Sequence, residues 1–324
     1  MKPKLVCVDE TFLNGPSGHH LPLFRKFFDV FDYDDTQTYD DYTTFMYRTD
    51  QSRAKVKKYE GTCKFIADGV WETNFFCKDN FDNKTLGIIN NGYTTNQCVL
   101  AVPKWFWFEE HFSQQEKKAS IKDMPFKHDK TKLFLLQMGD AKEPRVNLYK
   151  SLKEKGLLSN AIYSFLEYGI GLEGPVKNYN PEIPPFPQRA YRPEWYNKTE
   201  FTLIAECFQN IVDGDQDSVF ITEKTMKPIM YGHPFILVGD VRSLKILEMW
   251  GFETFSELFD QSYDTEKDIN KRIDMVVDQV SKYRYKDVED KIVDNFKRFW
   301  DTKLVEELMI KEMIEPILEF ISKK

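Results

Sequence analysis

An acidic and a basic side chain, Glu223 and Lys224, stand side by side at a polar corner within the segment SVFITEKTMKPIMYGHPFILVGD, residues 218–240. A carboxylate at such a corner can accept hydrogen bonds from ribose hydroxyls. The neighbouring lysine, together with free amides at the start of a helix, can hold a phosphate. In open α/β sheets, ligands bind at the carboxyl ends of strands, which is where this corner is expected. A solvated helix start without a ligand is the alternative interpretation of the same pair.

The residues around the pair predict the elements that position it. Residues 219–221 are β-forming and stop abruptly, which indicates a short strand before the corner. Pro228 has no amide hydrogen and fits a helix only near its start, so we expect the helix to begin within residues 222–225, with threonine as its cap. Gly232 ends the helix, and residues 234–239, PFILVG, predict a buried strand.

Composition indicates a globular protein with room for two domains. The chain has 324 residues, of which 41% are hydrophobic and 30% charged, and no apolar run is long enough to span a bilayer. The N-terminus lacks the apolar core of a signal peptide. The formal charge of −7 argues against a protein that coats nucleic acid through bulk attraction. The scattered cysteines favour reduced core thiols and a cytoplasmic location: Cys7, Cys63, Cys77, Cys98 and Cys207.

Strand-like and helix-like segments alternate on both sides of a polar, lysine-rich stretch at residues 114–131. This pattern predicts an α/β fold with two Rossmann-like domains facing a central cleft. We expect an N-terminal acceptor-side domain at residues 1–128 and a nucleotide-sugar-binding domain at 129–285. Residues 286–324 are expected to form C-terminal helices that pack on the domains.

Three further segments could bind a metal or a sugar. Residues 213–217, DGDQD, resemble a calcium loop but lack its glycine and its final glutamate, so an acidic turn is expected. The acidic run at residues 32–35 is interpreted as surface, and no metal site is predicted. The aromatic cluster WFWFEE, residues 105–110, is either a shelf for stacking sugars or alternation within a strand at a domain boundary.

The segment EFTLIAECF, residues 200–208, followed by VFITEK, residues 219–224, resembles the nucleotide-sugar signature of the α1,3-fucosyltransferase family. Exostosin-type glycosyltransferases carry a similar corner. Segments 64–76, 97–110 and 133–158 are similar to other parts of the same family, and their order is preserved. The resemblance implies a viral or bacterial type of enzyme with the GT-B fold, two Rossmann-like domains and no essential metal.

The resemblance also implies six residues that hold the nucleotide sugar: Arg145, Glu206, Phe220, Thr222, Glu223 and Lys224. Glu223 would hold the ribose hydroxyls and Lys224 a phosphate. Arg145 would bind the diphosphate, because a guanidinium pairs bidentately with phosphate. Phe220, where the family usually has tyrosine, would lie near the base.

A general base is needed to deprotonate the acceptor hydroxyl. The resemblance assigns this role to Glu72. His20, in the loop after the first strand, is the second candidate, and His19 and Glu10 on the same loop are further alternatives.

Together these features predict an inverting glycosyltransferase that moves a sugar from a nucleoside-diphosphate sugar, with a GDP-sugar favoured, to a hydroxyl of a glycan. The nucleotide sugar is a substrate, and no separate cofactor is expected. A phage-type enzyme that glycosylates a DNA base is one alternative. A nucleotide-sugar-binding module without turnover is another, because the segment at Glu72 lacks the asparagine that neighbours the family's glutamate. The oligomeric state is left open.

Overall fold

The structure is a computed structural model that describes residues 2–8, 21–40, 42–47, 50–60, 62–68, 84–89, 99–115, 130–172, 174–177, 193–206 and 219–323. The chain forms two compact units. Unit 1 comprises Met1–Gln114 together with Thr302–Lys324, and unit 2 comprises Gln115–Asp301. The chain therefore leaves unit 1 once and returns to it with its last helices.

Unit 1 is built on a parallel six-stranded sheet of order β2-β1-β3-β4-β5-β6. Its elements are β1 (Lys4–Cys7), α2 (Leu21–Phe27), β2 (Asp29–Asp32), β3 (Thr43–Tyr47), α3 (Asp50–Val56), η2 (Lys57–Tyr59), β4 (Lys64–Asp68), β5 (Thr85–Ile89), β6 (Val99–Ala101), α5 (Trp105–Ser113), α13 (Thr302–Met309), η7 (Ile310–Ile314) and α14 (Glu315–Ser322). The chain runs from β1 to β2 on one side and to β3 on the other, so the winding direction reverses between β1 and β3.

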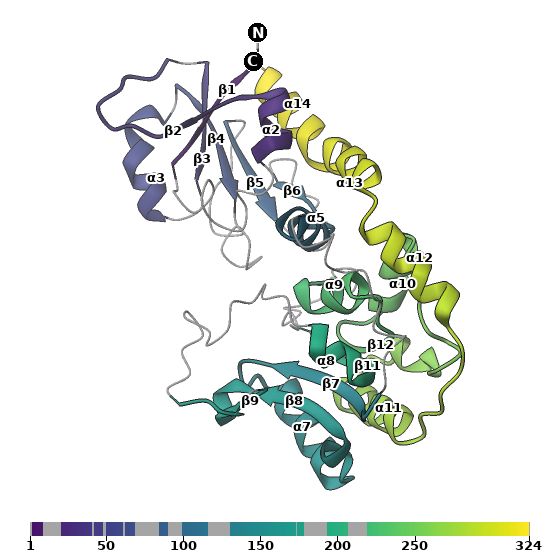
Figure 1. Ribbon diagram of the computed structural model, residues 1–324. Coiled ribbons are helices and arrows are strands. Elements are labelled where there is room, and N and C mark those ends of the chain that lie inside the picture. The colour runs from purple at the N-terminus through teal and green to yellow at the C-terminus, as the bar shows by residue number, and fades with distance from the viewer. Residues whose placement is uncertain are drawn as a thin grey trace. The chain divides into compact units, whose positions relative to one another are not determined.

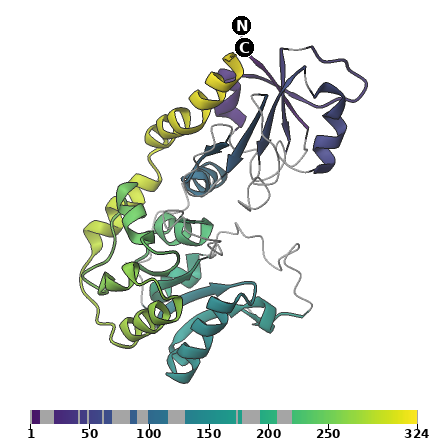
Figure 2. The ribbon, with the colours of Figure 1, turned by 180° about the vertical axis from the view of Figure 1, so that it is seen from behind.

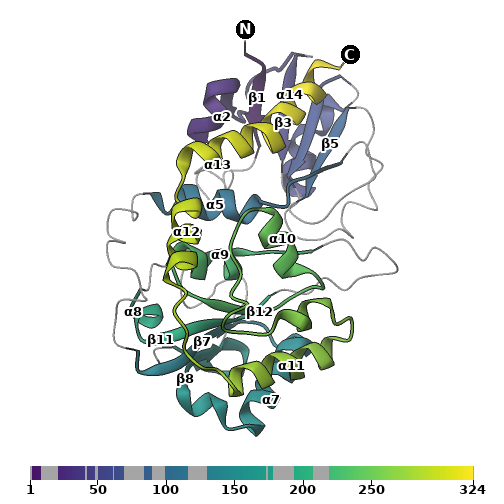
Figure 3. The same ribbon diagram turned by 90° about the vertical axis from the view of Figure 1, so that its right-hand side faces the viewer.

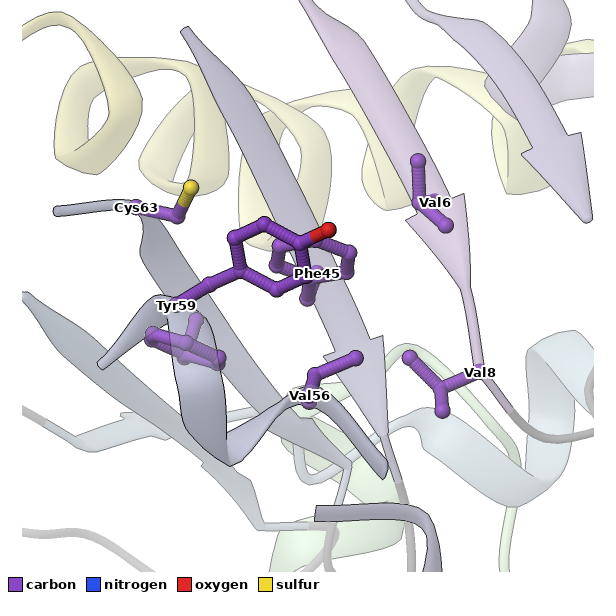
Figure 4. Close-up of a cluster of buried hydrophobic side chains, with 7 residues drawn as sticks. Val6, Val8, Phe45, Val56, Tyr59 and Cys63 are labelled. Atoms are coloured by element: carbon purple, nitrogen blue, oxygen red, sulfur yellow. The ribbon is translucent and has the colours of Figure 1, made fainter. Parts of the chain in front are cut away.

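The core of unit 1 includes a cluster of aromatic and aliphatic side chains on one face of the sheet (Figure 4). The rings of Phe45 on β3 and Tyr59 on η2 stack with centroids 5.0 Å apart. The cluster also contains Val6 and the neighbouring Val8, Val56 at the end of α3, the buried Cys63, and Phe65 on β4. Parallel strands covered on both faces are near-continuous apolar runs, and β1 fits this with three successive buried residues, Leu5, Val6 and Cys7.

Helices α13 and α14 lie beside α2 in unit 1 (Figure 3), and three lysines connect them to the rest of that unit. Lys26 on α2 pairs with Glu306 on α13 at 3.1 Å, and Lys104 before α5 pairs with Glu312. Lys64 on β4 donates to main-chain carbonyls at the end of α14, including that of Ile321 at 2.9 Å. Such a lysine satisfies carbonyls that a helix end leaves without partners. Helices α13 and α14 therefore belong to unit 1.

Unit 2 is built on a second six-stranded sheet of order β10-β9-β8-β7-β11-β12. Its elements are β7 (Lys132–Met138), α7 (Glu143–Glu154), η4 (Leu157–Asn160), β8 (Ala161–Phe165), η5 (Leu166–Tyr168), β9 (Ile170–Gly171), β10 (Gly174–Pro175), α8 (Pro193–Asn197), β11 (Thr199–Ala205), α9 (Glu223–Met230), β12 (Phe235–Val238), α10 (Ser243–Met249), η6 (Gln261–Thr265), α11 (Ile269–Ser281) and α12 (Glu289–Phe299). Strands β8, β7, β11 and β12 are parallel, whereas β9 and β10 form an antiparallel edge.

Helices cover both faces of the second sheet (Figures 1 and 2). Helix α7 packs against α11 on one face, and α9 packs against α12 on the other. The connection from β7 to β8 and the connection from β11 to β12 run in opposite directions along the sheet. Since crossovers between parallel strands are almost always right-handed, α7 and α9 are expected on opposite faces.

The predicted α/β fold class with two Rossmann-like domains is confirmed, since each unit has a mainly parallel sheet. That the two domains face a cleft stays a prediction. The interpretation of residues 105–110 as a strand is wrong, because they begin helix α5. A short apolar run does not distinguish a buried strand from a buried helix. Both tryptophans of the run, Trp105 and Trp107, are buried, which also excludes an exposed stacking shelf.

Candidate functional site

The carboxyl ends of β7 and β11 mark a switch point in the second sheet. From β7 the chain crosses to β8 on one side, and β11 lies next to β7 on the other side. The loops that leave two such neighbouring strands diverge, and ligands of open α/β sheets bind in the space between them. Two predicted site residues flank this point: Arg145 follows β7, and Glu206 directly follows β11.

Helix α9 begins where the sequence predicts, at Glu223, with Thr222 as its N-cap. The hydroxyl of Thr222 accepts a hydrogen bond from the amide of Lys224 at 3.3 Å, and its carbonyl accepts from the amide of Thr225 at 3.1 Å. The expectation that free amides at this helix start would hold a phosphate is therefore wrong for these two residues, because the cap already binds them. A phosphate here would depend on side chains.

Residues 219–221 are not a strand, contrary to the prediction. They are buried just before Thr222 and α9, and two amides of this segment bond to carboxylates rather than to a neighbouring strand. The amide of Phe220 donates to Asp240 at 3.1 Å, and that of Thr222 donates to Glu206 at 2.9 Å. The apolar, β-forming residues were a misleading signal, because the carboxylates of Asp240 and Glu206 accept the hydrogen bonds that a neighbouring strand would otherwise accept.

Glu206 holds the corner to the end of β11. It is fully buried, and one carboxylate oxygen accepts from the Thr222 amide and from the Thr225 hydroxyl, the latter at 2.6 Å. The other oxygen accepts from the Thr222 hydroxyl at 2.6 Å. Charge-assisted bonds of this kind are among the stronger ones in proteins. Glu206 therefore positions the start of α9 through its bonds to Thr222 and Thr225. Its direct contact with a nucleotide sugar stays a prediction.

The predicted acid–base pair at the corner forms an ion pair. The ammonium of Lys224 lies 2.9 Å from a carboxylate oxygen of Glu223, and the two side chains are 22% and 13% exposed. Burial acts to raise the pKa of Glu223, but the charges of Lys224 and Lys227 and the hydrogen bonds to the carboxylate outweigh it and lower the pKa to about 2. Glu223 is therefore ionised at neutral pH and remains a strong acceptor, neither pointing into bulk water nor sealed in the core.

Arg145 lies in the first turn of α7 and is only 2% exposed. Its guanidinium approaches the main-chain carbonyl of Asp140, 3.5 Å away, in the loop that leaves β7. Arg145 belongs to the helix that follows β7, whereas Glu206 directly follows the adjacent strand β11. Contact of Arg145 with a diphosphate stays a prediction.

The sequence analysis missed Asp240, a buried carboxylate just beyond β12. It accepts from the amide of Phe220, so β12 and β11 each contribute one carboxylate that binds the segment before α9. Its signal in the sequence was an acidic residue directly after the buried apolar strand predicted at residues 234–239.

Both predicted catalytic residues, Glu72 and His20, lie outside the described residues, as do the alternatives His19 and Glu10. The acidic segment 213–217 also lies outside them.

Among the residues that the structure does describe, no group of three or more His, Cys, Asp or Glu side chains is placed to hold a metal ion. No helix in the described part of the chain is long and apolar enough to cross a membrane.

Comparison with known proteins gives similarity in structure only. No protein-family model matches the chain, and no curated protein matches it. A crystal structure of an alpha1,3-fucosyltransferase is similar over 94% of this chain and 92% of its own, with 12% identity and a TM-score of 0.49. A crystal structure of an alpha1,3-fucosyltransferase with GDP-fucose covers 94% of this chain and 90% of its own, with 11% identity and a TM-score of 0.45. A likeness of this size does not establish an activity.

Proposed function

We propose that this protein is a glycosyltransferase that uses a nucleoside-diphosphate sugar as donor. The observation that carries the proposal is the ion pair of Glu223 and Lys224 at the start of α9, next to the switch point of a parallel sheet. A nucleoside diphosphate presents ribose hydroxyls and a charged pyrophosphate a short distance apart. An ionised carboxylate beside an ammonium matches that pair of groups.

In this proposal Glu223 accepts hydrogen bonds from the ribose hydroxyls, and the ammonium of Lys224 also forms an ion pair with a phosphate. Its ammonium already shares its protons between the Glu223 carboxylate and, more distantly, the Thr222 hydroxyl at 3.4 Å. A lysine so held loses little additional side-chain freedom when the donor binds, which favours affinity. Arg145 adds charge from the β7 side of the switch point, and Phe220 lies beside the base.

The reaction proposed is inverting transfer to a hydroxyl without an essential metal or separate cofactor. In such a reaction a base removes the acceptor proton while positive groups stabilise the departing diphosphate. Lys224 and Arg145 would serve the departing diphosphate. Glu72, on the resemblance of its segment, would serve as base, and His20, in the loop after the first strand, is the second candidate.

A GDP-sugar is the preferred donor and a glycan the preferred acceptor, again from the resemblance of the Thr222-Glu223-Lys224 corner. The scattered cysteines, of which Cys7 and Cys63 are buried, favour a cytoplasmic location. Acceptance of a DNA base instead of a glycan would require a basic groove, which the net charge of −7 does not favour.

Thermal shift with GDP, UDP and their sugar conjugates tests the proposal, because a ligand that binds only the folded state raises the melting temperature. We expect GDP and a GDP-sugar to stabilise the protein, followed by slow hydrolysis of that donor. Binding of GDP without any donor consumption, even with a panel of glycans, would indicate a non-catalytic binding module. Absence of a shift with every nucleotide at millimolar concentration would contradict both functions.

A further inference from the structure

Two carboxylates from neighbouring strands bind the segment before α9 at alternate amides. The amide of Phe220 donates to Asp240 at 3.1 Å, and the amide of Thr222 donates to Glu206 at 2.9 Å. Residues two apart in an extended chain face the same side. Thr222 has extended backbone angles, so this segment turns both amides toward the sheet edge where β11 and β12 end.

The two attachments differ in where they hold the segment. Glu206 binds Thr222 and Thr225, which are the cap and first turn of α9. Asp240 binds two residues earlier, at Phe220. With Glu206 alone, the segment could pivot about Thr222. With both, the direction of the backbone entering α9 is fixed, and with it the relation between the Phe220 ring and the Glu223 carboxylate.

Asp240 is itself held firmly. It is 5% exposed, and the Ser243 hydroxyl donates to its main-chain carbonyl at 2.7 Å. The Arg272 guanidinium, on α11, donates to the carbonyl of the preceding residue, Gly239. The charged groups that face the carboxylate are Glu206 and Arg272. Burial, with the charge of Glu206, raises the pKa of Asp240 to about 7, although the Phe220 amide and Arg272 act against this.

We propose that Asp240 is a positioning residue for nucleotide binding: it holds the Phe220 amide and so sets the spacing between the base-binding and ribose-binding parts of the site. This inference rests on the proposed function, since it concerns the same nucleotide. It adds a strand, β12, to the elements that shape the site. The inference assigns to Asp240 no contact with the nucleotide.

The test is isothermal titration of GDP and UDP into the full-length protein and three variants. Asp240→Ala removes the acceptor for the Phe220 amide, and we expect GDP to bind about tenfold more weakly, because binding must then also order the segment that Asp240 holds in the original protein. Asp240→Asn keeps an oxygen at that position and should bind within about threefold of the original protein. If Asp240→Ala does not fold, Asp240→Ser, whose short side chain does not reach the amide, takes its place.

Asp264→Ala is the matched control. Asp264 is also a buried carboxylate of unit 2 that accepts from main-chain amides, those of Leu244 and Lys245 at the start of α10, but it does not bind the 219–222 segment. We expect this variant to lose stability as Asp240→Ala does and to keep its affinity for GDP.

The outcomes separate the inference from the function. Weaker binding in Asp240→Ala that Asp240→Asn restores and that Asp264→Ala does not share supports the inference. Equal loss in Asp240→Ala and Asp264→Ala, or no restoration by asparagine, overturns it while the proposed function stands. If the original protein binds neither nucleotide, the proposed function fails, and the inference fails with it.

Discussion

The hydroxyl of Thr222 lies 2.6 Å from one carboxylate oxygen of Glu206, while the amide of the same threonine lies 2.9 Å from the other. The end of β11 and the start of α9 are therefore joined by a buried, charge-assisted contact, although 15 residues separate the two side chains in the sequence. A corner attached in this way can present Glu223 and Lys224 in one fixed geometry.

Replacing Glu206 by alanine should destabilise the protein by about 3 kcal/mol, because buried donors on Thr222 and Thr225 would lose their acceptor. Urea denaturation measures this change in the free energy of unfolding. Glu154→Ala is the control: Glu154 is exposed at the end of α7, and its loss should change stability by no more than about 0.5 kcal/mol. A change below about 1 kcal/mol in Glu206→Ala would refute the assigned role.

The cap of α9 should tolerate serine but not valine at position 222. Thr222→Val has nearly the same shape but loses the hydroxyl that bonds to Glu206 and to the Lys224 amide, so we expect a loss of about 1–2 kcal/mol. Thr222→Ser keeps the hydroxyl and should retain most of that stability. Denaturation of both variants under one set of conditions makes the comparison, and equal stability of the two would show that the hydroxyl does not matter.

Because His233 is buried as a neutral imidazole, we expect the folded protein to lose stability in mild acid. It is buried beside β11, where its ring nitrogens lie 2.9 Å from the Thr202 hydroxyl and 2.8 Å from the Thr199 carbonyl. The nitrogen facing the carbonyl must carry the hydrogen, so the other accepts from Thr202. Burial, together with the charge of Lys130, lowers the pKa of His233 to about 3, despite hydrogen bonds to carbonyls that favour the charged form.

The sign follows from proton uptake. Below pH 6.5 the unfolded chain protonates this histidine while the folded chain does not, so the free energy of unfolding falls as the pH is lowered toward 3. The loss attributable to His233 should reach about 1 kcal/mol between pH 6 and 5. His233→Asn cannot take up this proton. Its stability relative to the original protein should rise by that amount over the same interval, and a constant difference would contradict a buried neutral imidazole.

The sequence was sufficient to predict the corner because its signals are local. A threonine cap, a proline near the helix start and a glycine after the helix each depend on a few neighbouring residues, and α9 begins and ends accordingly. Gly232 has φ of +61°, a left-handed angle that glycine adopts without strain. The buried strand predicted at residues 234–239 is β12, Phe235–Val238, and it was predictable for a similar reason, since Gly232 and Pro234 precede it and Gly239 follows.

Long-range pairing decided the rest. Residues 219–221 have strand composition, but the acceptors for the segment are Asp240 and Glu206, which are remote in sequence and cannot be inferred from the run itself. Residues 105–110 pack on all sides as a helix because unit 1 buries them, and the pattern alone allowed either structure. The return of α13 and α14 to unit 1 accompanies the burial of apolar side chains such as Met309 and Ile317, whose contacts lie far away in the sequence.

The most direct measurement of the central claim is the dissociation constant of GDP, by titration calorimetry, for the original protein, Glu223→Gln, Lys224→Ala and the control Lys297→Ala. Lys297 is exposed in the last turn of α12, and its loss is expected to leave the affinity within about threefold. Loss of a hydrogen bond to a charged group in the other two variants predicts roughly tenfold weaker binding or more. If both variants bind GDP as tightly as the original protein, the pair does not hold the nucleotide, and the account is contradicted.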